Sequence, residues 1–147
     1  MKIRNAALGV STLALAAFLF SNPANAATNE PAYNPATSVA VSGIVTAVHE
    51  VPAGQPLEGV HVTIKNKNAS VEVYLGPRSF LKFLKTNVAV GDDIDVMGSR
   101  VKLGATDIVL AREVDDGRES VTLRDLYGAE AWKNWGVAAD PSAVPTH

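Results

Sequence analysis

The chain has 147 residues, no cysteine, and 13 Lys and Arg against 15 Asp and Glu, a formal net charge of −2. The lack of cysteine excludes disulfides, cysteine-based zinc sites and thiol catalysis. A chain of this length can bury enough apolar surface to fold as one domain without such cross-links. Its positive charges are dispersed, which disfavours nucleic acid as a partner, because binding to phosphate backbones relies on concentrated Lys and Arg.

The first 26 residues have the pattern of a secretory signal peptide. Lys2 and Arg4 precede an apolar run at 6–20, and Ala-Asn-Ala at 24–26 is a small-x-small cleavage site. The apolar run is shorter than the roughly 20 residues that span a bilayer. We therefore predict cleavage after residue 26 and a periplasmic or secreted protein with no transmembrane segment. Without Lys2 and Arg4 its net charge is −4.

Residues 27–37 contain two prolines and no hydrophobic periodicity, which predicts a flexible leader to the domain. Residues 38–51 are rich in β-branched side chains and predict a long first strand. Gly43 lies within it, and a glycine inside a strand usually marks a bulge or a bend. A long strand bent at a glycine can serve two sides of a closed sheet, as a small barrel requires.

Residues 60–66 and 69–75 alternate apolar and polar side chains, which predicts a hairpin of two half-buried strands. Asn66 and Asn68 suit the tight connection between them. The inward residues would be Val60, Val62, Ile64, Val71, Val73 and Leu75. The outward residues would be His61, Thr63, Lys65, Glu72 and Tyr74.

A short helix is predicted after Gly76 and Pro77, which end the third strand. Its apolar residues cluster at helical spacing and predict one buried face: Phe80, Leu81, Phe83 and Leu84. Lys82 and Lys85 should face solvent.

Three further strands are predicted after the helix. A short one covers 94–99, a central one 106–114, and a last one 119–123, after an Asp-Gly hairpin turn at 115–118. Residues 124–147 form an irregular C-terminal extension in which Trp132 and Trp135 stand in a short helical turn.

A helix between the third and fourth strands is the arrangement of the OB-fold. Residues 38–123 resemble a small exported bacterial OB-fold domain through Val-Ser-Gly-Ile-Val at 41–45, the stretch 90–99, and Ala-Arg-Glu-Val at 111–114. The ending at 123–132 resembles that of some proteins of this type. The resemblance implies an all-β protein with one short helix, a five- or six-stranded Greek-key barrel in the order β-β-β-α-β-β.

No catalytic motif is recognisable. Ser79, Ser99 and Ser120 lie outside any Gly-x-Ser-x-Gly elbow. The aspartates at 92–95 and 115–116 fall where turns are expected, and aspartate is a favourable turn residue. We therefore predict that the protein is not an enzyme.

A metal-handling alternative rests on His49 and His61. Two imidazoles and a carboxylate from Glu50 or Glu58 would suit a transition metal. Because the spacing is not that of a dense metal motif, two ordinary surface histidines are the preferred interpretation. The preferred prediction therefore includes neither a metal site nor a cofactor.

We predict an exported, monomeric, non-enzymatic OB-fold module that binds a protein or a small polar ligand. The second and third strands form the usual contact face of OB-folds. On that basis the ligand-binding residues would be His61, Thr63, Lys65, Tyr74 and Arg78. Besides metal handling, the alternative is single-stranded nucleic-acid binding through stacking on Tyr74. In a competing arrangement, the segment with Trp132 and Trp135 folds back and covers this face.

Overall fold

The computed structural model describes residues 30–134, so the predicted signal peptide lies outside the described residues. The elements are β1 (Ser38–Val51), β2 (Gly59–Lys65), β3 (Ser70–Gly76), α1 (Arg78–Phe83), β4 (Asp93–Leu103), β5 (Thr106–Asp115) and β6 (Ser120–Thr122). The predicted short strand at 94–99 is wrong in length, because β4 continues to Leu103 with Val101 and Leu103 still partly buried. The helical segments between residues 30 and 134 are all too short to traverse a lipid bilayer.

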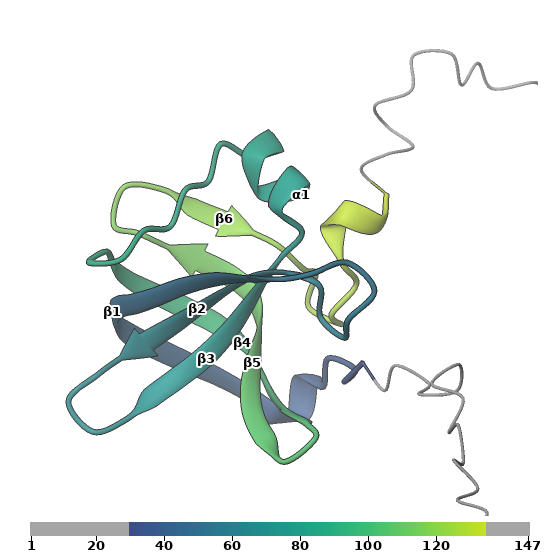
Figure 1. Ribbon diagram of the computed structural model, residues 1–147, viewed down its shortest axis with the longest axis horizontal. Coiled ribbons are helices and arrows are strands. Elements are labelled where there is room, and N and C mark those ends of the chain that lie inside the picture. The colour runs from purple at the N-terminus through teal and green to yellow at the C-terminus, as the bar shows by residue number, and fades with distance from the viewer. Residues whose placement is uncertain (1–29, 135–147) are drawn as a thin grey trace, which may run out of the picture.

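The strands form one sheet in the order β3-β2-β1-β4-β5-β6, and all neighbours in it are antiparallel. A further parallel pairing joins Glu72–Tyr74 of β3 to Ile108–Leu110 of β5 and closes the sheet on itself. A five-stranded Greek-key barrel with a helix between β3 and β4 is the OB-fold arrangement. The predicted all-β fold with one short helix is confirmed. Figure 1 shows α1 at one end of the barrel, on the side of β6.

β1 serves both sides of the barrel. Its first half pairs with β4 as far as Ile44, and from Ile44 onward it pairs with β2. Gly43 lies at this change of partner with φ of 156°, and a Cβ atom there would lie 2.4 Å from the carbonyl oxygen of Lys65. Only glycine permits so close an approach of two strands. The register irregularity of β1 lies just beyond it, between Val45 and Ala47.

The barrel interior is filled by apolar side chains from five strands, α1 and the segment after β6. The buried core consists of Val41, Val45, Val60, Val62, Ile64, Val73, Leu75, Phe80, Leu81, Ile94, Val96, Val109, Ala111, Val114 and Leu123. The inward positions predicted for β2 and β3 are confirmed, although Val71 is only partly buried.

The predicted buried face of the helix is partly wrong. Phe80 and Leu81 are buried, but Phe83 is 59% exposed. The side chains of Phe80, Leu81 and Leu84 share one stripe, and at about 100° per residue Phe83 lies roughly 100° from the middle of that stripe. The helix also ends at Phe83, so no further turn covers that side chain. Lys82 and Lys85 are exposed, as predicted.

The described part of the predicted leader is ordered against the barrel. Residues Pro35–Thr37 form a 3₁₀ turn, capped by the side chain of Asn34. The backbone N–H of Asn34 donates to Ser99 Oγ at 3.0 Å, and Thr37 Oγ1 lies 2.9 Å from the same atom. These bonds satisfy a hydroxyl that is fully buried and fix this part of the leader on β4.

The segment after β6 folds back on the barrel. Trp132 lies in a 3₁₀ turn at Ala131–Lys133, and its ring centroid is 5.7 Å from that of Phe80 and 6.1 Å from that of Tyr74. The competing arrangement is therefore the observed one for Trp132, which covers part of the predicted contact face. Trp135 lies outside the described residues.

Candidate metal centre

Three side chains that can ligate a metal meet on the outer face of β1, β2 and β3. His49 of β1 lies opposite His61 of β2. His61 in turn lies opposite Tyr74 of β3, and Glu72 is the next residue of β3 on the same face. Side chains that are opposite or diagonal on one face of a sheet are within reach of each other. Strand pairing alone therefore brings His49, His61 and Glu72 together.

The distances among these side chains are those of a compact cluster. His61 Nδ1 lies 3.0 Å from Glu72 Oε1, and His49 Nε2 lies 3.4 Å from the same oxygen. The two imidazole rings are stacked, with centroids 5.2 Å apart and planes inclined by 27°. One ligand atom from each of the three residues lies within 4.8 Å of the other two. A single cation placed between them could contact all three.

The hydrogen bonds of His61 direct one ring nitrogen toward this cluster. Its Nε2 lies 2.7 Å from the carbonyl oxygen of Leu57. A carbonyl only accepts hydrogen bonds, so Nε2 carries the hydrogen and the neutral ring has its lone pair on Nδ1. That lone pair faces Glu72 Oε1, which is also an acceptor. A proton or a metal ion is therefore required between the two atoms.

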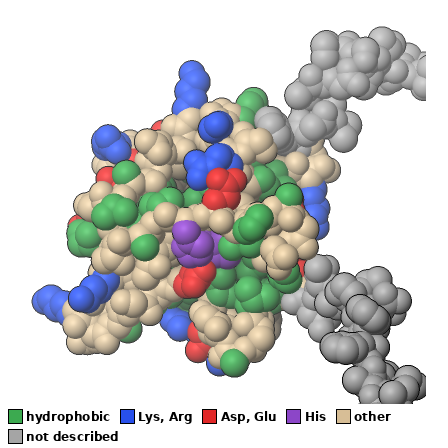
Figure 2. Space-filling view, in the orientation of Figure 1, with side chains coloured by type: hydrophobic (Ala, Val, Ile, Leu, Met, Phe, Trp, Pro, Cys, Tyr) green, Lys and Arg blue, Asp and Glu red, His purple; other side chains and the backbone are tan. Residues whose placement is uncertain are grey.

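The cluster has one buried member and two members that solvent can reach. The side chain of His61 is 2% exposed, whereas those of His49 and Glu72 are 47% and 34% exposed. Figure 2 shows a histidine patch at the molecular surface with acidic side chains beside it. The arrangement combines one rigid ligand with two that solvent can reach.

The loop between β1 and β2 and the ring of Tyr74 hold His61 in place. Leu57 is buried in a left-handed conformation with φ of 55°, which aims its carbonyl at the histidine. The Tyr74 ring lies 5.0 Å from the His61 ring, and its hydroxyl donates to the carbonyl of Glu58 at 2.8 Å. Burial raises the pKa of Tyr74 far above its usual value, so the hydroxyl stays a donor.

The predicted contact residues do not form one exposed face. They are His61, Thr63, Lys65, Tyr74 and Arg78. The expectation that His61 and Tyr74 point into solvent is wrong, because they are 1% and 2% exposed beneath the β1–β2 loop and Trp132. Thr63 is partly buried, Lys65 is exposed, and Arg78 is exposed but paired with Glu50. Their role in ligand binding stays a prediction, and a buried Tyr74 has no free face for base stacking.

The structure does bring His49 and His61 together, but with a carboxylate that the sequence analysis did not choose. Glu50 follows His49 and so points to the other side of β1, where it pairs with Arg78. Glu58 accepts from the backbone N–H of Gly54 at 2.8 Å. Glu72 takes the third position. The signal for it was present, because Glu72 and His61 are both outward residues of one predicted hairpin.

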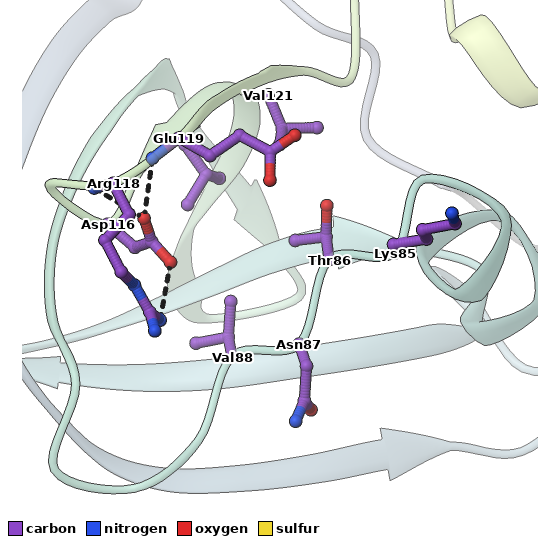
Figure 3. A pocket seen from close by; sticks show the side chains of 9 residues that line it. Lys85, Thr86, Asn87, Val88, Asp116, Arg118, Glu119 and Val121 are labelled. Atoms are coloured by element: carbon purple, nitrogen blue, oxygen red, sulfur yellow. Dashed lines mark hydrogen bonds and ion pairs between the residues drawn. The ribbon is translucent and has the colours of Figure 1, made fainter.

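A separate cavity of about 550 Å³ lies between the α1–β4 connection and the β5–β6 hairpin (Figure 3). Asp116 is its most engaged polar side chain and accepts from the backbone N–H groups of Arg118 and Glu119. The bond from Arg118 is the main reason that the pKa of Asp116 is lowered. Thr86 Oγ1 is buried there without a partner among residues 30–134. These groups form a turn and a rim, with no nucleophile–base pair among them.

Comparison with known proteins gives one family match. The model of the MamS/MamX magnetosome protein family matches residues 37–121, which include the whole cluster. No curated protein matches the chain. Similar solved structures include the S. pombe Stn1–Ten1 complex, with a TM-score of 0.44 and 10% identity. That match covers 60% of this chain and 71% of the other.

Proposed function

We propose that this chain, which belongs to the MamS/MamX magnetosome protein family, is a non-enzymatic protein that binds a divalent transition-metal ion at His49, His61 and Glu72. The observation that carries the proposal is the convergence of three ligand atoms within 4.8 Å on adjacent strands. The family name associates its members with the magnetosome. The predicted signal peptide supports a location outside the cytoplasm, and we propose that the protein acts there as a monomer.

The donor set favours first-row transition metals over calcium or magnesium. Two imidazoles and one carboxylate suit zinc, copper, iron, cobalt or nickel. Calcium and magnesium prefer oxygen ligands in larger number. Because His61 and His49 supply nitrogen at two of the three positions, we expect little competition from either of the hard cations.

The surroundings of His61 match those of metal-bound histidines. Such a histidine usually donates its second ring N–H to a carboxylate or a backbone carbonyl, which fixes the tautomer and the ring orientation. Leu57 supplies that carbonyl at 2.7 Å. The bond leaves the Nδ1 lone pair directed at the space shared with Glu72 and His49, so His61 is prepared for the ligand role before any ion arrives.

The proposal predicts that the protein binds one metal ion and that the loss of a single ligand weakens binding sharply. The exported protein, purified from the periplasm of an expression host and freed of metal, would be titrated calorimetrically with Zn²⁺ and Co²⁺. We expect equimolar binding, and a loss of at least about 100-fold in affinity for His49→Ala and Glu72→Gln. That exceeds the roughly 10–100-fold typical of losing a supporting residue.

Glu50→Gln is the matched control for Glu72→Gln. It removes the same charge one residue from His49 and disturbs only an exposed ion pair with Arg78, which is worth at most about 1 kcal/mol. We expect its metal affinity to stay close to that of the unmodified protein. Absence of binding in the unmodified protein, or an equal loss in Glu50→Gln and Glu72→Gln, would contradict the proposed site.

A second prediction concerns Tyr74 as a positioning residue. Tyr74→Phe keeps the ring against His61 but removes the hydrogen bond to the Glu58 carbonyl, next to the Leu57 carbonyl that orients the histidine. We expect metal affinity to fall by about 10-fold, in the range of supporting residues, with unchanged stoichiometry. The same titration measures it. An unchanged affinity would show that the loop holds His61 without Tyr74.

A further inference from the structure

The three ligands of the proposed centre all approach from one side. They come from three adjacent strands of one sheet face, and among residues 30–134 they form a cluster of three. Because His49 is exposed and Glu72 partly exposed, an ion held by them would lie near the surface, above the buried His61. Structural metal sites are usually closed by four protein ligands, whereas three ligands leave positions for other molecules.

The charge of such a centre is not balanced by its protein ligands. Two neutral imidazoles and one carboxylate leave a divalent ion with one net positive charge. The carboxylate of Glu50 is engaged with Arg78, and that of Glu58 with the backbone of Gly54. An exposed ion with residual positive charge and free coordination positions attracts an anionic ligand more strongly than a neutral one.

We infer that the metal ion at His49, His61 and Glu72 keeps adjacent open positions and takes a small bidentate anion with oxygen donors, forming a ternary complex. The inference rests on the proposed function. Two histidines and a carboxylate grouped on one face of a metal ion leave neighbouring positions on its opposite face. Neighbouring positions suit a chelating anion, whose two oxygens are held close together by their own skeleton.

Cobalt and oxalate test this inference directly. The cobalt-loaded protein should show the weak visible absorption of a five- or six-coordinate ion with bound water. Addition of oxalate should change that spectrum, and the change should saturate as the oxalate concentration rises. In equilibrium dialysis, radiolabelled oxalate should be retained at one equivalent per cobalt by the loaded protein and not by the metal-free protein. Acetate is the comparator, because it has the same donor type but a weaker chelating geometry, and we expect it to bind at least about 10-fold more weakly.

The outcomes separate the inference from the function on which it rests. Cobalt binding with an intense tetrahedral spectrum that oxalate does not change would overturn the inference and leave the metal site intact. Removal of cobalt by oxalate without retention of oxalate on the protein would overturn it as well. Failure to bind cobalt at all would overturn the proposed function. Glu50→Gln, loaded with cobalt, should retain the same amount of oxalate as the unmodified protein. This substitution frees Arg78 from its ion pair, so unchanged retention would show that oxalate binds the metal and not Arg78.

Discussion

Phe80→Ala is expected to lower the free energy of unfolding by about 3–5 kcal/mol, the range for truncating a buried phenylalanine. Its side chain is 4% exposed and contacts both the barrel core and the ring of Trp132. Removal of the ring would leave a cavity between α1 and the C-terminal segment. Trp132 is also held by Arg124 and Tyr74, so we do not expect its ring to fill that cavity. Urea denaturation followed by circular dichroism measures the loss.

Phe83→Ala is the matched control. It removes the same side chain from the same helix, at a position where the ring is 59% exposed and its centroid lies 6.5 Å from that of Phe80. We expect a loss below about 1 kcal/mol, as for most surface substitutions. Equal losses for the two variants would mean that Phe83 is buried in solution and that the helix lies differently on the barrel.

This contrast shows how much hydrophobic periodicity can predict about the buried face of a short helix. Apolar spacing correctly predicts a helix after Pro77 and correctly buries Phe80 and Leu81. It does not determine whether Phe83 is buried, because a helix of six residues can bury only a narrow stripe. The position of that stripe depends on where the helix ends. Lys85, just after the helix, has a left-handed φ of 56°, and the sequence does not predict that conformation for a lysine.

The strands were predicted well because alternation and turn residues are local signals. The two ends of β1 and the β2–β3 hairpin follow from residues close in sequence. The closing contact between β3 and β5 is parallel and joins residues 36 positions apart in the chain, from Glu72 to Ile108. That contact could be expected only from the resemblance to OB-folds.

Only part of the proposed metal centre could be predicted from the sequence, for the same reason. His61 and Glu72 lie on one face of a hairpin whose register is fixed by a tight connection. His49 joins them only through the register of β1 with β2, across a loop of seven residues, Pro52–Glu58. A shift of one residue in that register would have placed Glu50 beside His61 instead. His61 is also covered by the nearby loop that carries the Leu57 carbonyl, whereas the burial of Tyr74 depends on a distant segment, that of Trp132.

Truncation after Leu126 is expected to lower the free energy of unfolding by about 4 kcal/mol or more. Trp132 is partly buried against both core clusters, so its loss should cost about 3 kcal/mol, the lower end of the range for a buried aromatic side chain. The truncation also removes Glu130, the nearest carboxylate to the guanidinium of Arg124. Arg124 is 1% exposed, and burial lowers its pKa. A buried charge left without its partner adds a further cost.

The contacts of Arg124 explain why the loss should exceed that of one aromatic ring. Its guanidinium lies 4.6 Å from the Trp132 ring centroid and 5.3 Å from that of Tyr74, and it donates to the carbonyl of Ala111. Truncation would remove the Trp132 ring from the Arg124 guanidinium and expose the Tyr74 ring to water.

Denaturant unfolding of the truncated chain beside Trp132→Ala separates the two contributions to the loss. We expect Trp132→Ala to account for most of the loss, and the truncation to exceed it because only the truncation removes Glu130. Leu126→Ala, at a side chain that is 68% exposed, is the control and should change the free energy of unfolding by less than about 0.5 kcal/mol. A truncated chain as stable as the full chain would mean that the segment does not pack on Tyr74 and Arg124 in solution.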